Sequence, residues 1–189
     1  RGANRKNGSD MVKGILAMIL TASCGLFALS GDDGGYPVPA KTTERLFYIQ
    51  RNHNANTIVY DANFDAGGTL LADSPVDVYW LRYQEQGQRM ELRKVEKLFA
   101  YGAECSPVKG KKNEYEVKLV ADRNRDFRLV QKGPFNAMVV ASINNQESRI
   151  EHLYIYADNT SYWPKVKYIE FFGYNIKTGE PTYERVWNE

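Results

Sequence analysis

Residue types that commonly build catalytic and metal sites are scarce in this chain of 189 residues. It holds only two histidines and two cysteines, which excludes a histidine-rich metal site. Cys105 lies before a group of lysines in a turn-rich segment, and we interpret it as a half-buried structural thiol. With 43% hydrophobic and 25% charged residues, the chain is not disordered, collagen-like or a disulfide scaffold. These values predict one globular domain with its own core.

A surplus of charge of one sign is also missing from most of the chain. The formal net charge is +2, but the first thirty residues hold four basic residues and only one acidic residue. The remaining residues carry 21 basic and 22 acidic groups, so their formal charge is −1. We therefore expect no nucleic-acid partner and no attraction to anionic membranes through charge.

Long hydrophobic runs are absent except near the start, where residues 11–30 have the form of a bacterial secretory signal. Lys13 precedes an apolar run that is too short to span a membrane comfortably. Cleavage after Ser30 would release the domain, whereas an imperfect lipoprotein box that ends at Cys24 would attach a lipid there. Both routes predict an extracytoplasmic protein, either secreted or held in the periplasm or cell envelope, with residues 1–10 as upstream sequence.

Glycine, proline and aspartate are frequent in residues 31–43, which we interpret as a linker before a single β-rich domain at 44–189. In this domain, apolar and polar residues alternate with the period of two that is typical of half-buried strands. Turns rich in asparagine and glycine separate the alternating stretches. These stretches are residues 46–51, 57–61, 76–83, 114–121, 127–131, 137–143, 149–157, 166–172 and 182–187.

One stretch, residues 89–101, breaks this alternation. Its apolar residues recur near helical spacing among charged residues, and Gly102 follows as a C-cap. These apolar residues are Met90, Val95, Leu98 and Phe99. The pattern predicts one amphipathic helix that covers an open edge or end of the sheet. About nine strands with one helix predict a mainly β fold, either an antiparallel β-sandwich or a partly open β-barrel.

Three sequence motifs are similar to those of a known family. They are F-Y-I-Q-R-x-x-N-x-N-x-I-V-Y at 47–60, P-V-x-V-Y-W at 75–80 and A-Y-G at 100–102. The chain resembles a family of small secreted bacterial proteins that is catalogued only as a domain of unknown function. The resemblance runs from about Leu46 to Val186, and it implies export and a single domain but no activity.

Asp61, Asn63 and Asp65 have the alternate spacing of oxygen ligands in calcium loops, as do the corresponding residues of 122–126. Both stretches lack the glycine after the third ligand and the bidentate glutamate at position twelve. Asx turns at strand ends use the same residue types. We therefore favour turns over a metal site and expect no cofactor.

Arg51, His53 and Asp61 are the candidate catalytic residues, because they flank or lie across a predicted hairpin. A histidine beside a carboxylate can act as a general base, and an arginine can hold an anion. This set predicts a hydrolytic enzyme, although no nucleophile elbow, phosphate loop or zinc signature accompanies it. A surface turn with a solvated histidine explains the same residues and is the interpretation we favour.

Aromatic residues make up 13% of the chain, and tyrosine and tryptophan combine a large apolar area with a polar group. An outward row that includes Tyr79, Tyr154, Tyr156 and Trp163 would bind a ligand, although aromatic residues also suit strands. We therefore favour a noncatalytic extracytoplasmic module that binds a small ligand or an envelope component through an aromatic-rich sheet face or pocket. The hydrolytic enzyme and a lipid-anchored structural envelope protein are the alternatives.

Overall fold

The computed structural model describes residues 35–158, 160 and 165–188. The predicted signal segment with Cys24 and the predicted ligand residue Trp163 lie outside these residues. The described residues form eleven strands: β1 (Arg45–Arg51), β2 (Asn54–Ala62), β3 (Val76–Arg82), β4 (Gln88–Glu91), β5 (Ala103–Pro107), β6 (Glu114–Leu119), β7 (Asp122–Gly133), β8 (Asn136–Ile143), β9 (Gln146–Asp158), β10 (Lys165–Asn175) and β11 (Pro181–Trp187). The mainly β prediction is confirmed.

All strands belong to one sheet with the order β4-β3-β2-β1-β9-β8-β7-β6-β5, and β10 pairs with β9 and β11. Strand β9 is the branch point, because its first half pairs with β8, its second half pairs with β1, and both halves pair with β10. The β1–β9 pair is parallel, whereas the other strand pairs are antiparallel. The sheet is therefore mixed, and it has two more strands than the alternation predicted.

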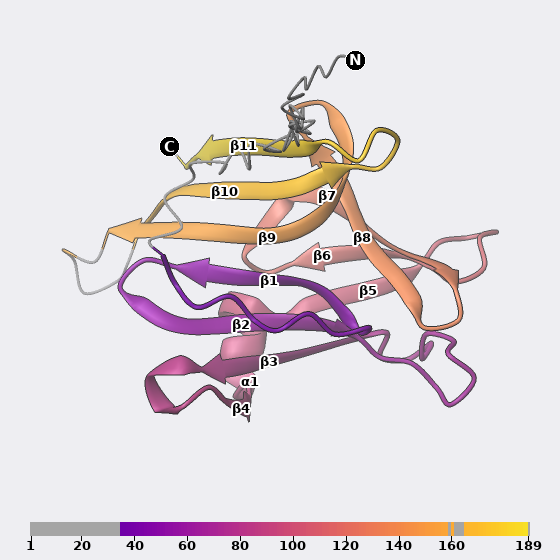
Figure 1. The fold of residues 1–189 in the computed structure, drawn as a ribbon, viewed down its shortest axis with the longest axis horizontal. Helices are drawn as coiled ribbons and strands as arrows, with labels where there is room; N and C mark the ends of the chain where they lie inside the picture. The colour runs from indigo at the N-terminus through magenta and orange to yellow at the C-terminus, as the bar shows by residue number, and fades with distance from the viewer. Residues whose placement is uncertain (1–34, 159, 161–164, 189) are drawn as a thin grey trace, which may run out of the picture.

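The sheet curls into two layers. Figure 1 shows β11, β10, β9, β1, β2 and β3 stacked in front, with β7, β6 and β5 behind them and β8 running between the layers. The main core lies between the layers, and its fully buried members come from both of them. On β6, Tyr115, Val117 and Leu119 are buried, whereas Glu116 and Lys118 are exposed, as the alternation predicted. An open sandwich of this kind fits the predicted fold class.

Residues 35–44, the described part of the segment before β1, contain no helix or strand, but they pack against the outer side of the front layer (Figure 1). The ring of Tyr36 stacks on Tyr154 with 6.3 Å between centroids. The carbonyl oxygen of Pro37 accepts a hydrogen bond of 3.1 Å from the side chain of Gln50. The described part of the expected linker is therefore held against β1 and β9.

The predicted helix is shorter than expected. Residues 88–91 form the edge strand β4, because their backbone pairs with β3 and Arg89 binds Asp77. Helical structure covers only α1 (Lys94–Glu96) and the π-helical turn Lys97–Tyr101 (η2). Met90, Val95, Leu98 and Phe99, the apolar residues of the expected helix, are all exposed.

Gly102 ends the helical turn in extended conformation instead of the left-handed conformation of a common C-cap. Only glycine fits at position 102, since a Cβ atom there would lie 2.1 Å from the carbonyl oxygen of Lys97. The helical segment joins β4, at one edge of the sheet, to β5 at the other. No helix within the described ranges is long and apolar enough to cross a membrane.

Cys105 on β5 packs against the core, and burial raises the pKa of its thiol from 9.0 to about 11. This shift lowers the fraction of thiolate near pH 7.5 about a hundredfold. A more basic thiolate is also about tenfold more nucleophilic, so the net reaction rate falls about tenfold. We expect Cys105 in a Cys24→Ser variant to react with a disulfide reagent about tenfold more slowly than the same chain unfolded in urea. Equal rates in the folded and unfolded chains would contradict a packed, neutral thiol.

Candidate ligand-binding site

The predicted catalytic set is not assembled. In the β1–β2 hairpin, Arg51 pairs with Asn54 beside the turn, whereas Asp61 pairs with Arg45 at the opposite end. The seven positions from Asn54 to Asp61 separate these ends by about 23 Å along an extended strand. His53 lies in the turn with a positive φ of 60° and is exposed. The hydrolytic arrangement was wrong because the strand carries its carboxylate away from the turn.

Asp61 instead belongs to a polar cluster on the outer side of the sheet. It accepts a hydrogen bond of 2.6 Å from Arg45 and another of 2.6 Å from the hydroxyl of Tyr79. Burial, together with this bond to Asp61, raises the pKa of Tyr79. The cluster joins β1, β2 and β3, and both carboxylate oxygens of Asp61 already accept hydrogen bonds.

The other predicted metal ligands also serve local structure. Asp65 accepts hydrogen bonds from the backbone amides of Gly67 and Thr69, which is an Asx turn, and the amide of Asn63 donates to Ser74. Among the described residues, no group of three histidine, cysteine or acidic side chains is placed to hold a metal ion.

The predicted aromatic surface is only partly available. Tyr79 and Tyr154 are 6% and 2% exposed, so neither offers a ring to a ligand. Tyr156 is half-buried and stacks on Tyr168 with 4.9 Å between centroids. Aromatic residues on both sides of the front layer therefore pack mainly against each other, and a pocket is the better candidate for binding.

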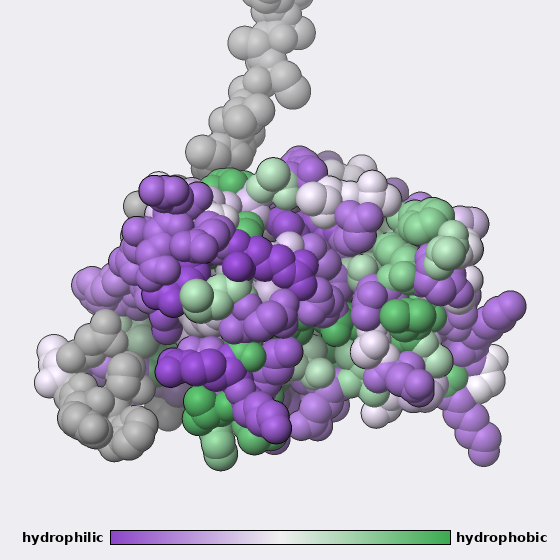
Figure 2. Space-filling model, turned by 90° about the horizontal axis from the view of Figure 1, so that it is seen from below, coloured by the Kyte–Doolittle hydropathy of each residue, from purple (hydrophilic) through white to green (hydrophobic). Residues whose placement is uncertain are grey.

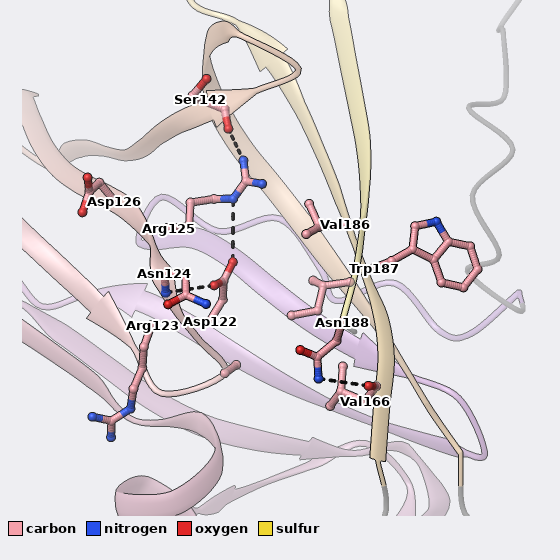
Figure 3. Close-up of a pocket in the computed structure, with 12 residues that line it drawn as sticks. Asp122, Arg123, Asn124, Arg125, Asp126, Ser142, Val166, Val186, Trp187 and Asn188 are labelled. Carbon is pink, nitrogen blue, oxygen red and sulfur yellow. Dashed lines mark hydrogen bonds and ion pairs between the residues drawn. The ribbon is translucent and has the colours of Figure 1, made fainter.

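One hollow lies beside the β6–β7 turn and the end of β11 (Figure 3). Its arginine, Arg125, binds Glu184 at 3.0 Å and the carbonyl oxygen of Ser142 and lies 3.7 Å from Asp122. Asp122 also accepts a bond from the backbone amide of Asn124, so the second calcium pattern forms an Asx turn. Arg125 and Asp122, the charged side chains at the centre of this hollow, therefore already have partners in the protein.

A second hollow of about 630 Å³ opens at the end of the sandwich where the β1–β2 turn lies. Its walls come from residues 51–54, from residues 99–101 of the helical segment, from residues 120–121 before β7, and from the ends of β9 and β10. A neighbouring hollow of about 490 Å³ shares Arg51 and Asn54 with it and is lined by polar and charged side chains. Arg51 therefore lies between a hollow that is apolar on one side and a hollow that is mainly polar.

The guanidinium of Arg51 is held by aromatic groups. Its Nη1 donates a hydrogen bond of 2.7 Å to the hydroxyl of Tyr101, and it lies 5.1 Å from the ring centroid of Trp80. Its Nε is buried and has no hydrogen-bond partner. Within the described part of the chain, Arg51 forms no ion pair with a carboxylate. Arg51 is therefore a half-buried cation that no carboxylate among the described residues neutralises.

Glu96, which lines the neighbouring polar hollow, is bound elsewhere. It accepts hydrogen bonds from the backbone and the guanidinium of Arg93, at 2.8 and 2.9 Å. Burial alone would raise the pKa of Glu96, but these hydrogen bonds lower it below its ordinary value. Glu96 therefore stays charged and committed to Arg93.

Two buried side chains hold the walls of the 630 Å³ hollow. The hydroxyl of Tyr60, fully buried in the core, donates a bond of 2.7 Å to the carbonyl oxygen of Tyr101. Asn52 donates to the carbonyl oxygen of Ala157 and accepts from its amide, both at 2.8 Å. Asn52 thus extends the parallel β1–β9 pairing with its side chain.

The Asn52→Asp variant should lose about 2–3 kcal/mol of the free energy of unfolding. A carboxylate still accepts from the Ala157 amide, but it presents an oxygen to the Ala157 carbonyl where the amide group donated. Urea denaturation followed by circular dichroism measures the loss, with the exposed Asn136→Asp as the matched control. A cost equal to that of the control would contradict the bridging role of Asn52.

Sequence reasoning identified Arg51 but missed its partners Trp80 and Tyr101, and it missed Asn52, which holds the wall of the hollow. Trp80 and Tyr101 are distant in sequence, yet the segments that carry the family resemblance, 47–60, 75–80 and 100–102, all contribute to these two hollows. The surface seen from below, where β4 and α1 lie, is largely hydrophilic, and its hydrophobic residues form separate patches (Figure 2). This face offers no broad apolar surface as an alternative to the hollows.

Comparison with known proteins supplies a family but no activity. No curated protein matches the chain, and no solved structure matches it. A family described as "Domain of unknown function (DUF4833)" matches residues 47–185, which is more than half of the chain, and the chain therefore belongs to this family.

Proposed function

We propose that the protein is a noncatalytic binding module that takes a small anionic ligand in the hollow beside Arg51. The observation that carries this proposal is the unneutralised charge of a half-buried arginine. A buried N–H without an acceptor costs about 1–3 kcal/mol, and a ligand oxygen would remove that cost. The aromatic contacts with Trp80 and Tyr101 fix the guanidinium in place before a ligand arrives.

The segment 11–30 supports an extracytoplasmic location as part of the same proposal, because it has the form of a secretory signal. A binding module outside the cytoplasm would collect its ligand in the periplasm, at the cell envelope or in the medium. Export tests this part: the mature protein should be found outside the cytoplasm. Recovery of the uncleaved chain from the cytoplasm would overturn the location without affecting the site.

The test of the site uses acetate and inorganic phosphate as probes, with the Nε–H resonance of Arg51 observed by NMR. We expect a saturable shift of this resonance with at least one of the anions, and a loss of affinity of at least tenfold in the Arg51→Met variant. Arg123→Met is the matched control, since Arg123 is exposed and points away from the neighbouring polar side chains (Figure 3). No saturable shift with either anion would overturn the proposed function.

A further inference from the structure

The 630 Å³ hollow has one polar end and one apolar side. The polar end is residues 51–54, with Arg51 among them. The apolar side includes Phe99, Val120, Ala121 and Ile155, and Val166 continues it onto β10. Two of the other hollows differ, because one holds Arg125, which is already paired with acids, and the second is lined by polar and charged side chains around Trp80 and Met90.

The apolar side is continuous with the protein interior. Ala121 and Val166 pack against the main core, and Ile155 is buried within it. Phe99 is 78% exposed and stands at the rim, so most of its apolar ring is open to water. A ligand in the hollow would therefore contact apolar side chains from the rim inward.

The free edge of the Arg51 guanidinium favours a carboxylate. Nη1 donates to Tyr101, whereas the buried Nε and Nη2 have no hydrogen-bond partner among the described residues. These two N–H groups are parallel, and once a movement of the side chain opens the buried Nε to the hollow, this edge would match the two oxygens of a carboxylate in a bidentate pair.

We propose that the ligand is an amphiphilic carboxylate of the fatty-acid type, with its carboxylate on Arg51 and its hydrocarbon chain against Phe99, Ala121 and Val166. This inference rests on the proposed function and names the ligand class of the same site. The volume of about 630 Å³ is within the range of about 300–1,000 Å³ that small-molecule pockets occupy. Removing apolar surface from water would supply most of the affinity, and the arginine would set the orientation.

Calorimetric titration of the full chain with acetate, hexanoate and decanoate, each below its micelle concentration, tests the inference. Affinity should rise about two- to fourfold for each methylene that enters the hollow, and at least tenfold from hexanoate to decanoate. Methyl decanoate and decyltrimethylammonium lack the carboxylate and should bind at least tenfold more weakly than decanoate.

Two variants locate the hydrocarbon chain. Val166→Asp should lower the affinity for decanoate at least tenfold more than that for acetate, because the added carboxylate repels both anions but only the hydrocarbon chain needs the apolar wall. Phe99→Ser should cost about threefold and preserves the fold because Phe99 is exposed. The matched control is Val38→Asp, an exposed valine outside the hollow, which should change neither affinity. Circular dichroism melting checks that each variant is folded.

The outcomes separate the two proposals. If acetate binds at Arg51 and decanoate binds no more tightly, the fatty-acid inference is wrong and the anion site stands. If decanoate binding survives both Phe99→Ser and Val166→Asp, or is lost equally in Val38→Asp, the chain does not lie in this hollow and the inference is overturned. If no anion perturbs Arg51, both proposals fail.

Discussion

Replacing Arg185 with methionine should lower the free energy of unfolding by about 3–5 kcal/mol. Arg185 lies on β11 and donates to the carboxylate of Glu170 from Nε and Nη2, at 2.9 and 2.6 Å. Glu170 is completely buried, and it also accepts a bond of 2.5 Å from the hydroxyl of Tyr183. Without the arginine, a buried negative charge loses the two hydrogen bonds and the positive charge of Arg185, and less of the cost of taking that charge out of water is offset.

The loss expected for Arg185→Met is large because Glu170, the partner that remains, is the buried member of the ion pair. Arg185 is partly exposed, so losing Glu170 leaves a cation that water can reach. Glu170→Gln should therefore cost less than Arg185→Met, and the double variant should be at least about 1 kcal/mol more stable than Arg185→Met alone. Urea denaturation measures all three, with the exposed Arg149→Met on β9 as the control, expected within about 0.5 kcal/mol of the parent.

If the double variant loses as much free energy of unfolding as the two single variants together, the Glu170–Arg185 pair does not act through its charges. The remaining contribution would then come from packing, because the guanidinium of Arg185 also lies over Tyr168 at 4.3 Å. The Arg185→Met variant retains most of that packing, whereas an alanine variant would remove it as well. Comparing the methionine and alanine variants therefore separates the contribution of charge from the contribution of packing.

Local alternation predicted most of the strands because each strand has to bury one face. On β6 the pattern gave the correct buried and exposed residues, and β10, apolar on both sides, is central, paired with β9 and β11. The parallel β1–β9 pair could not be predicted in this way, since it joins residues about a hundred positions apart and alternation does not encode strand order. Edge strand β4 was missed because an exposed strand needs no apolar alternation.

The candidate site was predicted in part for the same reason. Arg51 was recognised by its chemistry, but the hairpin that was expected to bring Asp61 to it carries that carboxylate to the opposite end. The partners of Arg51 come from β3 and the helical segment, and Tyr101 is 50 residues away in sequence. Strands β1 and β3 both pair with β2, which places Trp80 near Arg51, and the helical segment that joins β4 to β5 carries Tyr101. Sequence spacing therefore identifies single reactive residues better than it identifies which residues lie together in a site.

Truncating Phe171 to alanine should lower the free energy of unfolding by about 3–5 kcal/mol, the range for deleting a large aromatic side chain from a core. Phe171 lies on β10 in the front layer and is fully buried. Its ring is 6.5 Å from that of Phe127 on β7, and the guanidinium of Arg125 lies over it at 3.9 Å. The ring thus joins the two layers and supports the arginine of the hollow beside the β6–β7 turn.

Phe171→Leu separates the volume of the side chain from its aromatic character, since leucine fills most of the space but offers no ring face to Arg125. We expect a smaller loss of about 1–2 kcal/mol, part of it from the cation–π contact. Val186→Ala on the neighbouring edge strand is the control, because Val186 is exposed and its truncation should cost less than about 0.5 kcal/mol. If Phe171→Ala costs no more than this control, the layers do not depend on the ring. The packing of the front layer on the back layer would then depend on the other side chains of the core.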